Sequence, residues 1–287
     1  MFEQPWNMLF EYEQPPVVET VLSVKFRDMP GMTGPEIFDF WNNRLRCREE
    51  RPLTEAETQP FYQMPIELFG GAGRIVGPPI QFSTGTPPAR YCFTNQDRDD
   101  LVQLQRDWLA VNWRKQPGKE YTRYESGRAK FESVWKELTS HLAANKLGPL
   151  NPVQCEVTYI NHIYVDTGTF IDFAHAEQVT SLLGPAGDIL PAKPEGINAG
   201  FSYAVNDDED QPFARLRIQV DSAVSTEGGR KLLVMNLTFR GRPLSADLDG
   251  VLRLFDSGHN WIVGSFDALT TQQMHSLWIR KPRKVPE

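Results

Sequence analysis

Two short patterns in this chain carry residue types that do covalent or metal chemistry in enzymes. Ser133 and Lys136 have the Ser-x-x-Lys spacing of acyl-enzymes, but no Lys-Thr-Gly or Ser-Asp-Asn segment follows them. His175 and Glu177 have the His-x-Glu spacing of zinc deaminases, without the Pro-Cys-x-x-Cys segment that would complete the metal site. We therefore expect both patterns to be ordinary structural or surface features.

Residues that could hold phosphate or a cation are also incomplete as sites. Gly71 to Gly77 has the outline of a dinucleotide-binding loop, but Pro78-Pro79 follows at once and prevents the helix that such a loop requires. Asp207 to Asp210 lacks the spaced glycine and distal glutamate of a calcium loop, so it predicts a solvated hairpin turn. Asp247 and Asp249 suit the first turn of a helix, where carboxylates face the positive end of the helix dipole. The sequence predicts neither a cofactor nor a metal site.

The segment VTYINHIYV (157–165) predicts a strand with two polar residues at its centre. Because successive strand side chains point to opposite faces, Asn161 falls on the apolar face, and His162 and Tyr164 fall on the other. A buried amide needs hydrogen-bond partners, so we expect Asn161 to be structural, with a ligand contact as the alternative. Asn112 likewise lies at the end of an apolar stretch, the expected hairpin LVQLQRDWLAVNW (101–113). We therefore take Asn112, Asn161, His162 and Tyr164 as the candidate ligand-binding residues.

Composition narrows the classes of function. The 287 residues are 40% hydrophobic and 23% charged, which is typical of a globular chain. The net charge of −7 argues against a general nucleic-acid binder, which needs a basic surface. The one basic run, Trp278 to Lys284, is expected to be a solvated chain end.

Cysteine spacing and hydropathy bear on the compartment. Cys47, Cys92 and Cys155 are odd in number and have no Cys-x-x-Cys spacing, which fits a reducing compartment. No basic flank precedes an apolar run at the start of the chain, and no apolar stretch approaches the ~20 residues of a spanning helix. These observations predict a cytoplasmic protein without a signal peptide or a membrane segment.

The elements fall into an arm, residues 1–14, and two halves, residues 15–150 and 151–287. The first half predicts a strand over 17–26, a helix over 36–46, a hairpin over 101–113 and a long helix over 121–145, while 48–90 is unassigned. The second half predicts a strand from 152, a helix over 173–183, strands over 197–205, 213–220 and 231–239, a long helix from 245 and a short one over 271–278. These assignments rest on the spacing of apolar residues, on runs of β-branched residues in strands and on the Gly-Pro pairs that end helices.

Each half thus has the order strand, helix, antiparallel strands, long helix. We expect a pseudo-duplicated α+β fold with two antiparallel sheets, each packed by a long helix. This order resembles the TATA-binding-protein and helix-grip architectures. Such a likeness of fold carries no function by itself.

Four stretches resemble a sporadically distributed family of bacterial proteins of unknown function. They are PPVVETVLSVKF (15–26), LVQLQRDWLAVNW (101–113), VTYINHI (157–163) and a closing helix with His259, Phe266 and Leu269-Thr270. Thr158 and His162 stand where the family has basic residues, so a role for positive charge there is not expected. The resemblance implies a bacterial, cytosolic, non-housekeeping protein, and it carries no catalytic residues.

These observations favour a non-catalytic interaction or regulatory protein, a partner or sensor in a bacterial defence or toxin-type gene cluster. We expect its partner to be another protein, not a membrane or a nucleic acid, and homo-oligomerisation stays open. One alternative is a small-ligand binder with a cavity between sheet and long helix; packing of Phe131, Trp135 and Leu138 into that space would count against it. The other alternative is a hydrolase whose site assembles from distant residues.

Overall fold

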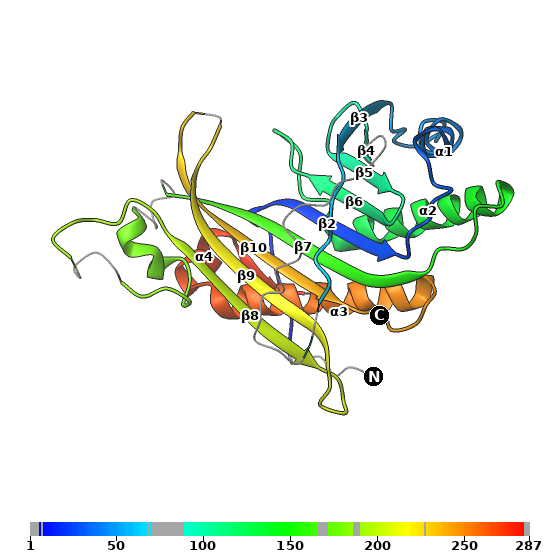
Figure 1. The fold of residues 1–287 in the computed structure, drawn as a ribbon. Helices are drawn as coiled ribbons and strands as arrows, with labels where there is room; N and C mark the ends of the chain where they lie inside the picture. The colour runs from blue at the N-terminus through cyan, green and yellow to red at the C-terminus, as the bar shows by residue number, and fades with distance from the viewer. Residues whose placement is uncertain are drawn as a thin grey trace.

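The computed structural model describes residues 6, 8–67, 69, 89–165, 172–185, 190–226 and 228–283, so the glycine-rich segment 71–79 lies outside the described residues. One antiparallel sheet of nine strands dominates the fold (Figure 1), in the order β3-β4-β5-β6-β2-β7-β10-β9-β8. Its strands are β2 (Val17–Phe26), β3 (Glu55–Pro60), β4 (Ala89–Thr94), β5 (Asp100–Gln105), β6 (Trp108–Arg114), β7 (Pro152–Tyr164), β8 (Asn198–Asn206), β9 (Pro212–Val224) and β10 (Lys231–Gly241). The hairpin expected over 101–113 is confirmed as β5 and β6, which pair from Asp100 opposite Trp113 to Gln105 opposite Trp108.

The prediction of two separate sheets is wrong, because β2 and β7 pair with each other. Their antiparallel register runs from Val17 opposite Asn161 to Phe26 opposite Pro152. Strands of residues 15–150 lie on one side of this pair, and strands of residues 151–287 lie on the other. The physical reason is that two separate sheets would each expose a long apolar edge strand, and pairing β2 with β7 satisfies the backbone groups of both.

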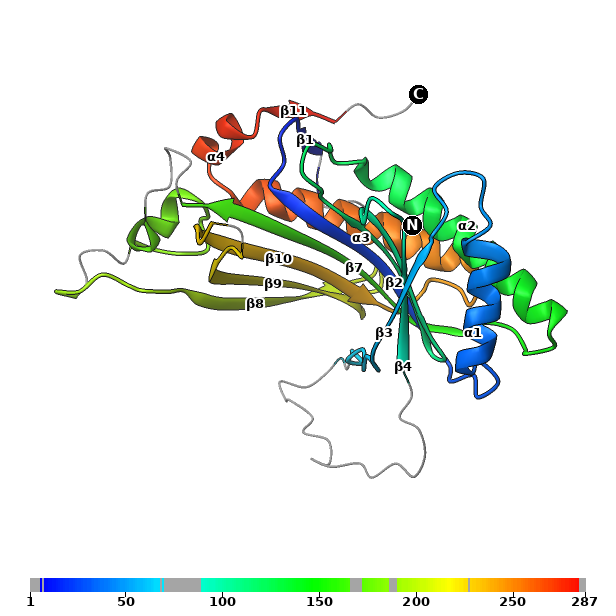
Figure 2. The ribbon, with the colours of Figure 1, turned by 90° about the horizontal axis from the view of Figure 1, so that it is seen from above.

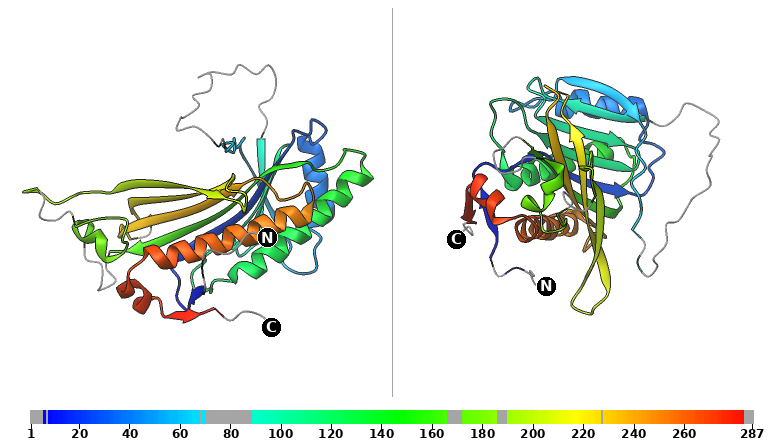
Figure 3. Two further views of the ribbon diagram at one scale, coloured as in Figure 1. Left: turned by 90° about the horizontal axis from the view of Figure 1, so that it is seen from below. Right: turned by 90° about the vertical axis from the view of Figure 1, so that its left-hand side faces the viewer.

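Both long helices cover the same face of the sheet. They are α2 (Arg123–Ala144) and α3 (Leu248–Leu269), which lie side by side in Figures 2 and 3. Phe131 of α2 meets Phe255 of α3 edge to face, with ring centroids 4.8 Å apart. Asp247 caps α3 by accepting a hydrogen bond from the Gly250 N–H at 2.9 Å, as expected for a carboxylate at this end of a helix.

The smaller helices agree less closely with the sequence. The helix expected over 36–46 is α1 (Gly34–Phe40), which continues as a π-helix (Trp41–Leu45). The helix expected over 173–183 is only a 3₁₀ helix (Phe173–Gln178), because Thr180 leaves it to pair with Thr270. The last helix is α4 (Gln272–Leu277). None of the helices in the described ranges has the length and apolar character needed to cross a bilayer.

The two ends of the chain form a small sheet beside α3. Strand β1 (Phe10–Tyr12) of the arm pairs with β11 (Arg280–Pro282), and Trp6 lies against Gly264 of α3. The basic run near the end is therefore not simply solvated, which corrects that expectation. The guanidinium of Arg280 lies 3.4 Å from the ring centroid of Phe10 and pairs with Asp267 at 2.5 Å.

Buried side chains of α2 and α3 pack much of the space between the sheet and the helices. Phe131, Trp135 and Leu138 are all buried in the core, as the helical stripe predicted. Helix α3 approaches the sheet most closely at Gly258, where an added Cβ would lie 2.8 Å from Phe239 Cδ1 and 3.0 Å from Val157 Cγ2. Gly258 is therefore required by packing rather than by backbone conformation.

A pair of helical glycines tests this packing. Gly258→Ala should destabilise the protein by about 1–3 kcal/mol, because Phe239 and Val157 are fully buried and cannot move away from the new methyl group. Gly127→Ala in α2 is the matched control, since its Cβ would lie 4.0 Å from the nearest atom, on Leu22. It should stabilise by roughly 0.5–1 kcal/mol through helix propensity alone. Urea unfolding measures both, and equal gains in the two variants would contradict the close approach of α3.

Candidate functional site

The structure does not bring the four candidate residues together. Asn161 points to the face that α2 and α3 cover, as do its neighbours Tyr159 and Ile163. His162 and Tyr164 point to the opposite face, which none of the helices in the described residues covers and which we call the open face. Asn112 also lies on the open face, because it alternates with the core residues Val111 and Trp113. A single ligand therefore cannot contact all four.

Asn112 is engaged within the sheet. Its side-chain oxygen accepts a hydrogen bond from Gln103 at 2.9 Å, and its side-chain nitrogen donates to Glu19 at 2.5 Å. The guanidinium of Arg230 lies over the ring of Tyr164, 4.1 Å from the ring centroid. His162 is half-buried, and burial lowers the pKa of its imidazole. Asn112 thus joins three strands, and its polar atoms are not free for a ligand.

Asn161 behaves as a buried amide that joins two strands. It is 4% exposed, and its side-chain nitrogen donates to the backbone carbonyl of Met235 on β10 at 3.1 Å. In the sheet, Met235 is also the residue opposite Asn161. The amide therefore adds a side-chain hydrogen bond to the β7–β10 ladder, which supports a structural role.

Beside Asn161 lies a small cavity of about 110 Å³, which is lined by a buried cluster of tyrosine and histidine side chains. Tyr159 Oη lies 2.8 Å from His259 Nδ1 and 3.2 Å from Tyr121 Oη, and Tyr124 stacks on His259 with centroids 4.0 Å apart. Burial, with a smaller contribution from Arg283, lowers the pKa of His259 well below its usual value, and burial raises the pKa of Tyr121 to about 12. The cluster thus holds a neutral histidine and neutral tyrosines, and it stabilises the junction of α2, α3 and β7.

A second cavity, of about 170 Å³, lies between α2 and the first-half strands. Lys130 lines it, 3.1 Å from Asp100 Oδ1, and burial lowers the pKa of this lysine to about 8. Ser133 also lines the cavity, but its hydroxyl donates to Glu137 at 3.2 Å, and Lys136 forms an exposed ion pair on the same helix. The Ser-x-x-Lys pattern therefore does not form a nucleophile and base.

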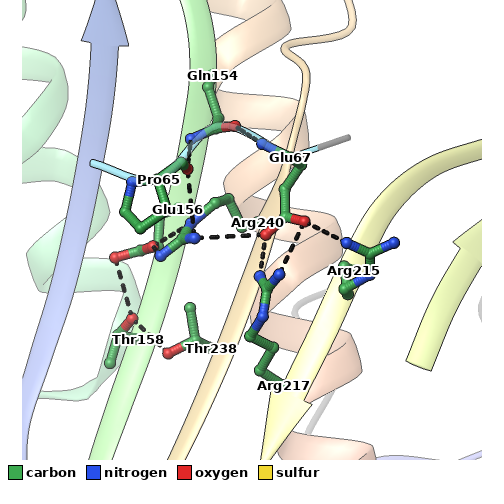
Figure 4. A network of polar contacts seen from close by, with 9 residues as sticks. All are labelled: Pro65, Glu67, Gln154, Glu156, Thr158, Arg215, Arg217, Thr238 and Arg240. Atoms are coloured by element: carbon green, nitrogen blue, oxygen red, sulfur yellow. Dashed lines mark hydrogen bonds and ion pairs between the residues drawn. The ribbon is translucent and has the colours of Figure 1, made fainter. Parts of the chain in front are cut away.

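A network of charged side chains lies on the open face (Figure 4). The carboxylate of Glu67 accepts from Arg215 at 2.6 Å and from Arg217 at 3.0 Å, and it lies 3.4 Å from Arg240 Nη1. Arg240 also donates to Glu156 on β7 at 2.5 Å. Strands β7, β9 and β10 supply four of these groups, and Glu67 comes from a segment that crosses the sheet. We call the three guanidiniums the arginine cluster.

Burial makes the pairing with Glu67 important. Glu67 is 4% exposed, and an ionised carboxylate at such a position requires charged or hydrogen-bonding partners. Burial and the neighbouring charge of Arg240 lower the pKa of Arg217, because both disfavour a further positive charge. Glu67 pairs with all three arginines, and Glu156 of β7 pairs with Arg240 as well, so Glu67 adds a second carboxylate to this charged group.

Two glutamines of the sheet hold the backbone of the crossing segment, residues 61–67. Gln105 donates to the carbonyl of Tyr62 at 2.8 Å and accepts from the N–H of the same residue at 3.0 Å. Gln154 donates to the carbonyl of Pro65 at 2.8 Å and accepts from the N–H of Glu67 at 2.8 Å. Each amide therefore binds a backbone donor and a backbone acceptor, as a neighbouring strand would.

Between the two glutamines, the segment packs on an apolar patch of the open face. Met64 forms a buried cluster with Trp108 and Ala110, and Tyr62 lies over Trp108 with ring centroids 4.9 Å apart. Trp108 Nε1 and the hydroxyl of Ser23 are buried on this face without a hydrogen-bond partner among the described residues. The segment therefore covers the apolar patch, but it leaves Trp108 Nε1 and the Ser23 hydroxyl without a hydrogen bond among the described residues.

Sequence reasoning missed this arrangement. Glu67 lies in the stretch 48–90, where no periodicity indicated a role. The signal that was present is the alternation in β9, where Arg215 and Arg217 flank the buried Leu216 and so share one face. In the parts of the chain that the structure describes, no group of three His, Cys, Asp or Glu side chains could hold a metal ion.

No protein-family model matches the chain, and no curated protein or solved structure matches it either. The resemblance to a bacterial family therefore stays a prediction.

Asn161 and His162 provide a direct comparison of the two faces. Asn161→Ala should lower the free energy of unfolding by about 1–3 kcal/mol, because the buried Met235 carbonyl loses its side-chain donor. His162→Ala, on the open face, should change it by no more than about 0.5 kcal/mol. Urea melts decide between the two roles of Asn161. Unchanged stability together with loss of a binding activity would show that it contacts a ligand.

The buried His259 predicts the pH dependence of stability. Its pKa is lowered in the folded state, so the unfolded chain binds a proton below pH ~6.5 that the folded chain does not. Stability is therefore full above that pH and falls as the pH decreases. His259→Phe should make the free energy of unfolding fall less steeply between pH 6.5 and 5.0. Urea melts across this range measure it, and an unchanged pH slope would mean that His259 is protonated in the folded protein.

Proposed function

We propose that this protein is an interaction protein that binds extended, acid-containing peptide segments on the open face of its sheet. The observation that carries the proposal is the way the chain already holds residues 61–67. Gln105 and Gln154 bind the backbone of this segment, and the arginine cluster binds its carboxylate. In this proposal the segment occupies the peptide site in cis.

The contacts indicate what a partner segment would need. An aromatic or apolar side chain would pack on Trp108, and a carboxylate a few residues later would reach Arg215 and Arg217. Arginine binds carboxylates through two parallel hydrogen bonds, which gives geometric specificity as well as attraction. A partner that also bonded Trp108 Nε1 and Ser23 would gain contacts that the segment in cis lacks.

The segment in cis would also regulate binding. A tethered competitor has an effective concentration in the millimolar range, so a partner in trans must displace it and binds with reduced apparent affinity. Any change that weakens the contacts of Glu67 should therefore strengthen binding in trans. This arrangement suits a sensor or a regulated partner better than a permanently assembled subunit.

The setting of this function is part of the proposal. From the family resemblance, we propose a bacterial protein that works within a defence or toxin-type gene cluster. The three free cysteines fit the cytoplasm as its compartment. Genomic neighbours test the setting, because ordinary metabolic genes beside this one would remove it. The alternative, a small-ligand binder, would use the cavities that remain between sheet and helices beside the packed Phe131, Trp135 and Leu138.

A peptide titration tests the peptide site. The probe is an amidated, fluorescently labelled peptide with the sequence of residues 60–67, PFYQMPIE. It should bind the Glu67→Ala chain about tenfold more tightly than the unmodified chain, because that variant loses the carboxylate that competes in cis for the arginine cluster. Fluorescence anisotropy measures the affinity.

Matched controls separate a site from a general charge effect. Glu57→Ala removes an exposed carboxylate from β3 and should leave peptide affinity at the unmodified level. Adding Arg217→Ala to Glu67→Ala should abolish the gain, and so should a peptide that ends in glutamine instead of glutamate. If the Glu67→Ala chain binds no peptide, or binds the glutamine peptide equally well, the proposed site is wrong.

A further inference from the structure

The two edges of the nine-stranded sheet differ in a way that bears on assembly. Edge strand β3 contains Glu55 and Glu57 and ends in Pro60, which are features that prevent another strand from pairing with it. Edge strand β8, with the sequence NAGFSYAVN (198–206), has neither a charged residue nor a proline along its nine residues. A long edge strand without such protection is a template for strand pairing.

The outward-facing backbone groups of β8 follow from its pairing with β9. The Ile197 carbonyl accepts from the N–H of Ser222 at 2.8 Å, so the backbone of Ile197 faces β9. In an antiparallel pair, successive residues alternate between facing the partner strand and facing away. The N–H and C=O groups of Asn198, Gly200, Ser202 and Ala204 therefore point away from β9, at the edge of the sheet.

Apolar surface lies along the same edge. Phe201 and Tyr203 share the helix-side face of β8, since their partners on β9, Ile218 and Leu216, belong to the core. Phe201 is partly buried, but Tyr203 is 42% exposed, although it lies on the apolar face of the sheet. Another strand beside β8 would cover this ring.

We infer that β8 pairs with β8 of a second copy of this chain, antiparallel and centred on Ser202. This register places Phe201 of one copy opposite Tyr203 of the other, and Gly200 opposite Ala204. Aromatic pairs across strands stabilise sheets, and no like charges meet along the paired strands. The two-fold axis makes the contact self-complementary, so assembly stops at the dimer.

A second copy suits this edge better than an unrelated partner. A partner strand chosen by charge would find no charged residue on β8 to recognise, whereas the same uncharged strand supplies matching aromatic and small residues. The inference does not depend on the peptide site, because it rests on the backbone edge of β8 and on the rings of its helix-side face. It would, however, place two arginine clusters on one continuous face, since Arg217 lies opposite Ser202 in the β8–β9 pair.

Sedimentation velocity of the full chain over a range of concentrations tests the inference. We expect the unmodified chain to sediment as a concentration-dependent dimer. Ser202→Pro removes an N–H that faces the edge but not the β8–β9 ladder, and Ser202→Lys places a charge at the two-fold axis, where it meets its own copy. Each should weaken dimerisation by about tenfold or more.

Thr58→Lys, an equally exposed change on the opposite edge strand β3, is the matched control and should leave the dimer intact. Circular dichroism should show that all three variants keep the sheet. An unmodified chain that remains monomeric at every concentration, as it would if a different protein covered β8, overturns the inference. A dimer that survives both Ser202 substitutions overturns it equally.

Discussion

The pairing of β2 with β7 is the contact on which the rest of this structure depends. It joins strands from the two parts of the chain into one sheet, so that a single face carries both long helices and the other face stays open. Because side chains alternate across that pair, Asn161 and Tyr159 enter the core beneath α3, while Glu156 and Thr158 reach the open face. One register therefore sets both the packed side and the charged side of the molecule.

The charged groups of the open face would destabilise the fold separately, but they stabilise one another when they lie together. Three guanidiniums crowded on neighbouring strands repel one another, and a carboxylate that is almost fully covered needs positive partners. Glu67 and the arginine cluster meet both requirements, and the two glutamines fix the backbone that delivers the carboxylate. This combination of backbone and side-chain recognition is what peptide-binding surfaces use.

Local patterns predicted most elements of this fold but not their joining. Strands β2 and β7 to β10, the hairpin at 101–113 and both long helices follow from alternation, helical stripes and Gly-Pro stops, whereas β1, β3, β4 and β11 were not predicted. Asn161 stood out as a polar residue on an apolar face. The β2–β7 pair could not be predicted in this way, since it links residues about 135 positions apart and either strand could have ended a separate sheet. Glu67 escaped notice because its segment has no period, and its role comes only from distant strands.

The position of β2 also has a consequence for how the chain is made. When a ribosome has completed residues 1–150, β2 can pair with β6, but its other edge has no partner until β7 has emerged. Strand β1 cannot pair with β11 until residues 280–282 have emerged. The growing sheet therefore keeps an unpaired strand edge through much of synthesis, first on β2 until β7 emerges and then on β7 until β10 emerges. Unpaired strand edges of this kind make nascent chains prone to aggregation and dependent on chaperones.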